Sequence, residues 1–312
     1  MNIIGKSKIW FAFSGILCAT SVVFLVIWGL KPGIDFTGGS LLRLEFVGTR
    51  LNNEQIAEVL NDVSQYGQPT IQPVGEGEVI IRLKELDEIK HQEVLQKLES
   101  KAKEVGGENA AAENIKETKF DSIGPSIGKE LREKSQLAIL FVLAAIIAYI
   151  AWAFREVSTS ISKYESAVYG IFAIIALVHD ILITLGVFSF LGHFYNVEVD
   201  TFFIAALLTI LGYSVNDTII VFDRIRENII HRTSESFPEL VNKSIDETIV
   251  RSFNTSMATL MVLFCILLFG GKTTYYFILA LLIGISAGTY SSIFLASPLL
   301  VWWKGRRRTV IT

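Results

Sequence analysis

Asp217 is the residue of this 312-residue chain that most clearly could do chemistry. It lies in LGYSVNDTIIVFDRIREN, within an apolar run, Thr201–Phe222, that is long enough to cross a bilayer. An ionised carboxylate there costs about 2.5–3.5 kcal/mol on insertion scales, so it must face other helices, find a partner or bind a proton. Helical spacing puts Tyr213, Asn216 and Ile220 on the same broad face. These residue types predict a proton-binding site, and the alternative is a polar contact that only holds helices together.

Arg251 is the predicted partner of this acid. It opens the next apolar segment, in TIVRSFNTSMATLM, and the two segments are consecutive and antiparallel, so both groups should lie at similar depth. A facing pair holds the carboxylate ionised, and separation of the two groups invites a proton. The pair therefore predicts a proton switch coupled to helix movement. The alternative is a basic flank that only reaches toward the membrane surface.

Other polar side chains in the apolar segments could extend this site. After Arg251, four residues at helical spacing could line a water path or hydrogen-bond a neighbouring helix. These residues are Asn254, Thr255, Ser256 and Thr259. His179 and Asp180, in an earlier segment, form a second polar pair that could join the same network. The other histidines are expected in exposed regions, without a role: His91, His193 and His231.

Long apolar segments must position these residues. The chain is 51% hydrophobic, with a mean hydropathy of +0.47, which favours membrane spans over a large soluble core. Its net charge of -3 gives no support to nucleic-acid binding. The predicted spans are Ile9–Leu30, Leu137–Phe154, Ser166–Leu191, Thr201–Phe222, Ile249–Gly270 and Thr274–Trp303. The small-residue run GISAGTYSS in the last span predicts close contact with another helix, which another subunit could supply.

Basic residues predict the orientation of the spans. They gather in four regions that six spans place on one side, which is predicted to be cytoplasmic. These residues are Lys6, Lys8, Arg155, Lys163, Arg224, Arg226, Arg232, Lys243, Lys304 and Arg306, Arg307 and Arg308. The predicted parts are residues 1–30 (cytoplasmic N-terminus and first span), 31–136 (outer domain), 137–303 (five spans) and 304–312 (basic cytoplasmic tail). Residues 223–248 are predicted to form a cytoplasmic interfacial helix.

The polar block between the first two spans has a pattern of its own. Leu41–Phe46 alternates like a strand, Asn52–Gln65 carries a helical stripe, and TIQPV-GEG-VIIRLK is a hairpin. A second amphipathic helix, Asp87–Val105, precedes a last strand in Ile115–Phe120. The predicted fold class is thus a membrane α-helical protein with six transmembrane helices and a small extracytoplasmic α+β ferredoxin-like (βαββαβ) domain between the first and second helices.

The segment GIDFTGGS, which contains Gly33 and Thr37, connects the first span to this domain. Gly38 and Gly39 allow positive φ, and the Asp35 side chain can accept backbone amides, so a tight turn is predicted. No Lys-Ser/Thr pair follows, so nucleotide binding is not expected.

No group of residues predicts an enzyme, because a nucleophile–base arrangement is absent from the sequence. Cys18 and Cys265 lie inside apolar runs, where cysteine serves as a small apolar filler. No zinc-type spacing occurs either. We therefore expect no metal, no cofactor and no disulfide.

Five motifs together resemble the SecF family, the smaller subunits of the bacterial SecDF protein-export complex. They are GIDFTGG, SIGPSIGKEL, LVHDILITLG, LGYSVNDTIIVFDRIREN and RSFNTSMATLM, in the family's order and over nearly the full chain. The related SecD subunits are similar in plan, but they have a much larger extracytoplasmic region and a different fourth-span signature.

The resemblance implies a role in protein translocation at the bacterial inner membrane. Family members associate with the SecYEG channel and use the proton-motive force to help pull preproteins through. SecD and SecF form a pseudo-symmetric twelve-span unit that is related to the RND transporters. The implied partners are SecD, SecYEG, accessory proteins of the YajC/YidC type, the preprotein and the lipid bilayer. No nucleic acid is expected.

The resemblance also implies roles for individual residues. Asp217 and Arg251 match the family's proton-pathway acid and arginine, without departure from the motif. Asn254, Thr255 and Ser256 match the polar stretch beside that arginine. One elementary charge that crosses 100 mV releases about 2.3 kcal/mol, enough to shift a two-state conformational balance.

Two alternatives belong to other function classes. Half of an RND-type exporter of small molecules or lipids would need a larger outer domain with substrate pockets. A membrane scaffold that organises the insertion machinery would keep its function after Asp217→Asn, whereas a proton-driven subunit would lose it.

Overall fold

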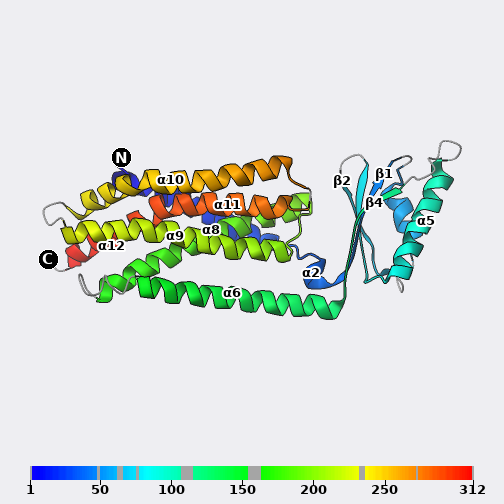
Figure 1. Ribbon diagram of the computed structural model, residues 1–312, viewed down its shortest axis with the longest axis horizontal. Helices are drawn as coiled ribbons and strands as arrows, with labels where there is room; N and C mark the ends of the chain where they lie inside the picture. The colour runs from blue at the N-terminus through cyan, green and yellow to red at the C-terminus, as the bar shows by residue number, and fades with distance from the viewer. Residues whose placement is uncertain are drawn as a thin grey trace. The chain divides into compact units, whose positions relative to one another are not determined.

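The computed structural model describes residues 2–47, 50–61, 66–74, 77–106, 115–153, 163–231, 236–271 and 273–310. They form two compact units, one made of Met1–Lys31 with Leu137–Thr312 and the other of Pro32–Gln136. Figure 1 shows long helices in the first unit and a sheet with its own helices in the second.

Six helices of the described chain are long and apolar enough to cross a membrane, as predicted. The last of them passes from α11 through a π-helical segment, η3, into α12. The helices are α1 (Ser7–Ile27), α6 (Pro125–Ala153), α8 (Lys163–Tyr195), α9 (Thr201–His231), α10 (Phe237–Phe269) and α11 (Tyr275–Ser291) with η3 (Ser292–Ala296) and α12 (Ser297–Val310).

Several helices extend beyond the predicted spans. α9 continues past Phe222 to His231, and α10 begins at Phe237 rather than at Ile249. The described part of 223–248 therefore continues these two helices, and the predicted separate interfacial helix is wrong. The continuation is stabilised by polar contacts between α9 and α10, such as Asn228 Nδ2 to Ser244 Oγ at 2.9 Å.

Small residues let α9 and α11 approach each other closely within the first unit. A Cβ atom on Gly288 would lie 2.9 Å from Cβ of Ser214, and one on Gly284 would overlap the Ile210 side chain. The close contact predicted from GISAGTYSS is thus made with α9 of the same chain. Several of the polar side chains described below lie along this contact.

The second unit is the predicted βαββαβ domain. Its antiparallel sheet has the order β2-β3-β1-β4, which is the ferredoxin-like arrangement. Its elements are β1 (Gly39–Phe46), α3 (Asn53–Val59), β2 (Thr70–Val74), β3 (Glu78–Leu83), α5 (Glu88–Gly106) and β4 (Ile115–Ile123). Side chains of β1 and β3 alternate between buried and half-buried, and the buried ones pack with those of α3 and α5.

The helices of this domain differ in detail from the prediction. α3 ends at Val59, whereas the predicted helix ran to Gln65, and part of that difference lies outside the described residues. Asp87 is the expected N-cap of α5, because its Oδ1 accepts the Lys90 amide at 2.9 Å. The prediction that His91 is exposed is wrong, since it is buried and its ring stacks on Phe120 at 3.7 Å.

The GIDFTGG motif forms a corner with the beginning of α6. Gly38 has φ +72° and Gly39 has φ +118°, as the glycines predicted, while a one-turn helix, α2 (Ile34–Thr37), comes just before them. A Cβ atom on Gly38 would lie 2.9 Å from Cα of Pro125, and one on Gly39 would lie 2.7 Å from the Leu83 carbonyl oxygen. Two sequence motifs that are far apart in the chain thus pack against each other here.

Gly39→Ala is expected to destabilise the second unit by about 1–3 kcal/mol, because a side chain is strained at positive φ. The added methyl group would also press on β3. Gly77→Ala is the matched control, because its Cβ would meet only the Phe46 carbonyl oxygen at 3.6 Å. Thermal unfolding of the full chain, followed by proteolysis within residues 32–136, measures the difference. Equal stability of the two variants would contradict the strain argument.

Candidate functional site

Asp217 lies on the buried face of α9, with only 1% of its surface exposed. Ser256 of α10 donates a hydrogen bond to its Oδ2 at 3.1 Å. The Thr289 hydroxyl of α11, which donates to the Ile285 carbonyl oxygen at 2.9 Å, also lies near this carboxylate. Ser214 and Val221 are buried on the same side of α9, one turn to either side. The acid therefore points into the bundle, where three helices meet.

The predicted Asp217–Arg251 ion pair is absent from the described chain. The reason is the rotation of α10 about its own axis. In this orientation Ser252 and Ser256 are buried, and Arg251 is exposed. Arg251 lies about 100° around the helix from Ser252 and about 140° from Ser256. Similar depth in two consecutive helices does not determine which side chain of α10 faces α9.

The other predicted residues of this site lie on exposed faces. Asn216, one residue before the buried acid, is exposed on α9, and Asn254 and Thr255 are exposed on α10. Thr255 Oγ1 donates to the Arg251 carbonyl oxygen at 2.9 Å, within its own helix. We call Arg251, Asn254 and Thr255, which are three and four residues apart on α10, the exposed polar face. Of the predicted group, the structure brings only Ser256 to Asp217.

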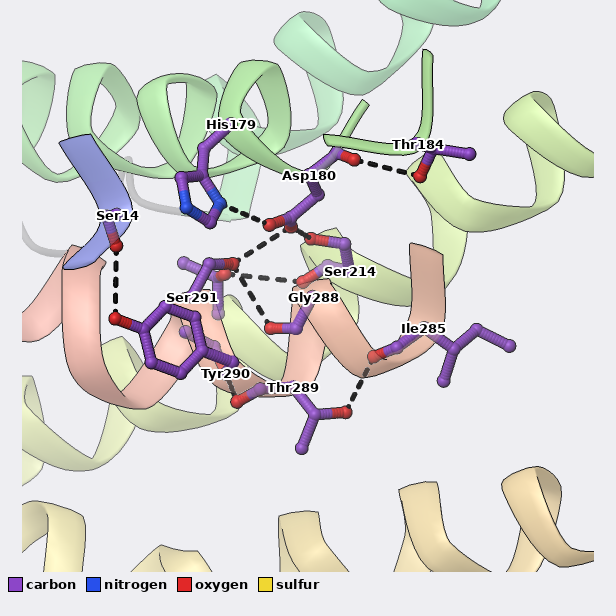
Figure 2. Close-up of polar contacts among 12 residues, drawn as sticks. Ser14, His179, Asp180, Thr184, Ser214, Ile285, Gly288, Thr289, Tyr290 and Ser291 are labelled. Atoms are coloured by element: carbon purple, nitrogen blue, oxygen red, sulfur yellow. Dashed lines mark hydrogen bonds and ion pairs between the residues drawn. The ribbon is translucent and has the colours of Figure 1, made fainter. Parts of the chain in front are cut away.

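His179 and Asp180 of α8 form a second buried cluster, which Figure 2 shows. His179 Nδ1 lies 2.9 Å from Asp180 Oδ1. Two serine hydroxyls donate to the other carboxylate oxygen, Ser214 of α9 at 2.5 Å and Ser291 of α11 at 2.9 Å. Asp180 is fully buried, and His179 is 4% exposed. The pair is therefore held by three helices, like Asp217.

The two acids share their supporting helices. On α9, Ser214 contacts Asp180, and Asp217 follows three residues later. On α11, Thr289 interacts with Asp217, and Ser291 contacts Asp180. That the second pair joins the network around the first acid stays a prediction.

Sequence reasoning missed several polar residues of the two clusters. Short hydroxyl side chains within apolar helices resemble packing residues, so composition gives no signal. Spacing of three or four residues from a known acid would have identified Ser214. The missed residues are Ser214, Thr289 and Ser291.

The described residues contain no group of three or more His, Cys, Asp or Glu side chains that could hold a metal ion. The polar atoms of both clusters are hydroxyls, carboxylates and one imidazole. Such groups can bind and pass protons, because each can donate or accept a hydrogen bond.

The sequence matches two family models. "Protein export membrane protein SecD/SecF, C-terminal" covers residues 104–306, and "SecD/SecF GG Motif" covers residues 23–49. Protein translocase subunit SecF of Thermobaculum terrenum is 40% identical, over 95% of this chain and 92% of its own length. This chain belongs to the SecF family. The SecF of Vibrio alginolyticus is 39% identical, over 94% of this chain and 86% of its own length.

Solved structures agree with this membership. The crystal structure of SecDF, a translocon-associated membrane protein from Thermus thermophilus, superposes with a TM-score of 0.78 and 33% identity over 98% of this chain. SecDF in its super-membrane-facing form gives a TM-score of 0.67 and 32% identity. This chain spans 39% of either solved chain. As a SecF-family chain it is a membrane protein of the protein translocase family, and the matching relatives are named as translocase subunits rather than as enzymes.

Ser256→Ala is expected to lower the free energy of unfolding by about 0.5–2 kcal/mol, since it removes a buried hydroxyl donor to Asp217. Thr255→Ala is the matched control, because the adjacent hydroxyl is exposed and contacts only its own helix. The control should change stability by less than about 0.5 kcal/mol. Unfolding of the purified chain in lipid–detergent micelles distinguishes the two variants. A larger loss from Thr255→Ala would contradict the described orientation of α10.

Proposed function

We propose that this SecF-family chain acts with SecD as an auxiliary subunit of the Sec protein translocase. In this proposal, the two subunits use the proton-motive force to promote preprotein translocation across the cytoplasmic membrane. The observation that supports it best is the environment of Asp217. Among the described residues its carboxylate has hydroxyl partners, and no cation pairs with it.

Such an environment suits an acid that gains and loses a proton. An ionised carboxylate within a span is unfavourable unless it is compensated, and protonation removes the charge. Ser256 can remain bonded in both states, because a hydroxyl can donate to a carboxylate or accept from a carboxylic acid. The proton then changes the charge of the bundle without removing the contact between α9 and α10.

Arg251 is the second component of the proposed switch, as the cation whose distance from Asp217 changes. The described arrangement has Asp217 and Arg251 on different faces, which corresponds to the separated state that favours a proton on the acid. Movement of α10 relative to α9 would bring the guanidinium nearer and favour release of the proton. Asn254 and Thr255 lie on the same side as Arg251 and would move with it.

The exposed polar face supports SecD as the membrane partner. A guanidinium and an amide that face hydrocarbon are unfavourable, so another chain or water must cover them. Arg251 has no ion pair within the described chain. The relatives with solved structures are SecDF chains, of which this chain matches only one part. SecYEG, accessory proteins of the YajC/YidC type and the translocating preprotein are further proposed partners.

The same proposal includes a location and an orientation. Both termini and residues 223–248 lie in the cytoplasm, because the basic residues of the loops gather there. Residues 31–136 then form an extracytoplasmic domain, on the side where a translocating chain emerges. The membrane is the bacterial inner membrane.

Asp217→Asn is expected to abolish the increase in preprotein translocation that a proton gradient produces in membrane vesicles. The amide preserves the shape and a hydrogen-bonding oxygen, but it cannot exchange a proton. Asp223→Asn is the matched control, because Asp223 lies on the same helix with its side chain 60% exposed. Association with SecD should be intact in both variants. Full gradient-driven stimulation in Asp217→Asn would instead support a scaffold.

A photo-crosslinking amino acid in place of Thr255 is expected to capture SecD in native membranes, because this position lies on the exposed polar face. The same amino acid in place of Ile147 of α6, which is also exposed, is the control and should capture lipid or nothing. Mass spectrometry identifies the captured chain. Capture of SecD from the α6 position alone would contradict the assignment of the SecD interface to α10.

A further inference from the structure

The imidazole of His179 has one nitrogen with no hydrogen-bond partner. Nδ1 faces Asp180, but Nε2 is buried and contacts no donor or acceptor of the described chain. The side chain is 4% exposed. Buried polar atoms without a partner are rare, and each one calls for an explanation.

The contacts of Asp180 indicate where the proton of the pair lies. Its Oδ2 accepts hydrogen bonds from Ser214 and Ser291, and its Oδ1 faces His179 Nδ1. With Asp180 ionised, both of its oxygens act as acceptors, and Nδ1 then carries the hydrogen of the imidazole. In the neutral ring, Nε2 is then a free acceptor.

We propose that the His179–Asp180 pair is a second proton-binding site of the membrane unit, with Nε2 of His179 as the acceptor atom. Neutral His179 with ionised Asp180 carries a charge of -1, and one added proton gives an imidazolium–carboxylate pair of net charge zero. No bond other than the new N–H forms. The inference rests on the proposed function, in which this unit exchanges protons with the two sides of the membrane.

The surroundings of the pair fit this role. The Tyr290 ring lies 6.1 Å from the His179 ring, and its hydroxyl is 3.1 Å from Ser14 Oγ of α1, so polar atoms continue from the pair toward α1. Titratable groups on the neighbouring helices include Cys18 of α1, which interacts electrostatically with Asp180, and Tyr290 of α11. Asp217 lies on α9, three residues after the serine that contacts Asp180.

The second site is coupled to the first through two helices. Ser214 and Asp217 are three residues apart on α9, about 4.5 Å along the helix axis. Thr289 and Ser291 connect α11 to both acids. A proton at one site therefore changes the electrostatic field at the other, and the two sites bind protons interdependently.

Solid-state nitrogen NMR of the full chain in membranes with SecD tests the proposal, because the sequence contains only four histidines. With histidine labelled at both ring nitrogens, the resonances that His179→Asn removes are assigned to His179. The asparagine amide lies near the Nδ1 position, so it can keep the hydrogen bond to Asp180 without a titratable nitrogen. The expected result is a change of these resonances from neutral imidazole to imidazolium as the pH falls.

A His179 signal that stays in one state across the pH range of stable folding overturns the inference. His193→Asn is the matched control, because His193 lies on the same helix but is exposed and stacked on Trp28. It should remove another resonance and leave that of His179 unchanged.

Translocation in vesicles provides the second readout. His179→Asn should lose the gradient-driven stimulation, as Asp217→Asn does, while His193→Asn retains it. Full stimulation in His179→Asn overturns a role for the second site in transport. If Asp217→Asn keeps full stimulation while His179 still titrates, the proposed function fails and the proton-binding site remains, so the two failures are distinguishable.

Discussion

A carboxylate within the hydrocarbon must find all its partners inside the protein, and this constraint organises the membrane unit. Asp217 and Asp180 meet it in the same way, with hydroxyl donors from neighbouring helices. The hydroxyl donors are short side chains, so the helices that carry them must approach closely. Gly284 and Gly288 permit that approach between α9 and α11. The close packing of the helices and the hydrogen bonding of the buried carboxylates thus depend on each other.

The separation of buried and exposed polar groups follows from the same constraint. The carboxylates lie in the interior, where hydroxyl groups can reach them. Arg251 lies on an exposed face that a second chain can cover. In the solved SecDF structures a comparable half is one part of a longer chain. In the proposed function, SecD is the chain that covers this guanidinium.

The sequence predicted the α+β domain better than it predicted the membrane site. Alternation in β1 and β3 and the helical stripes of α3 and α5 mark one buried face, because the opposite face meets water. Helices in a membrane are apolar on every side, so hydrophobic periodicity does not show which face points inward. The prediction that Arg251 faces Asp217 is wrong for this reason, although the sequence did predict that Asp217 faces other helices. The role of Asp217 in a proton pathway remains a prediction.

The π-helical segment η3 begins directly after Ser291 and ends at Ala296. It holds the backbone in an i→i+5 pattern, so α12 is rotated relative to a continuous α-helix. Loss of one residue inside the segment would restore ordinary α-helical winding, and Trp302 and Trp303 would keep nearly the same direction, because the wider π-helical turns offset the roughly 100° that one extra residue adds. A single-codon deletion in η3 would thus shorten this helix by one residue, while the two tryptophans and the serine that contacts Asp180 keep their directions.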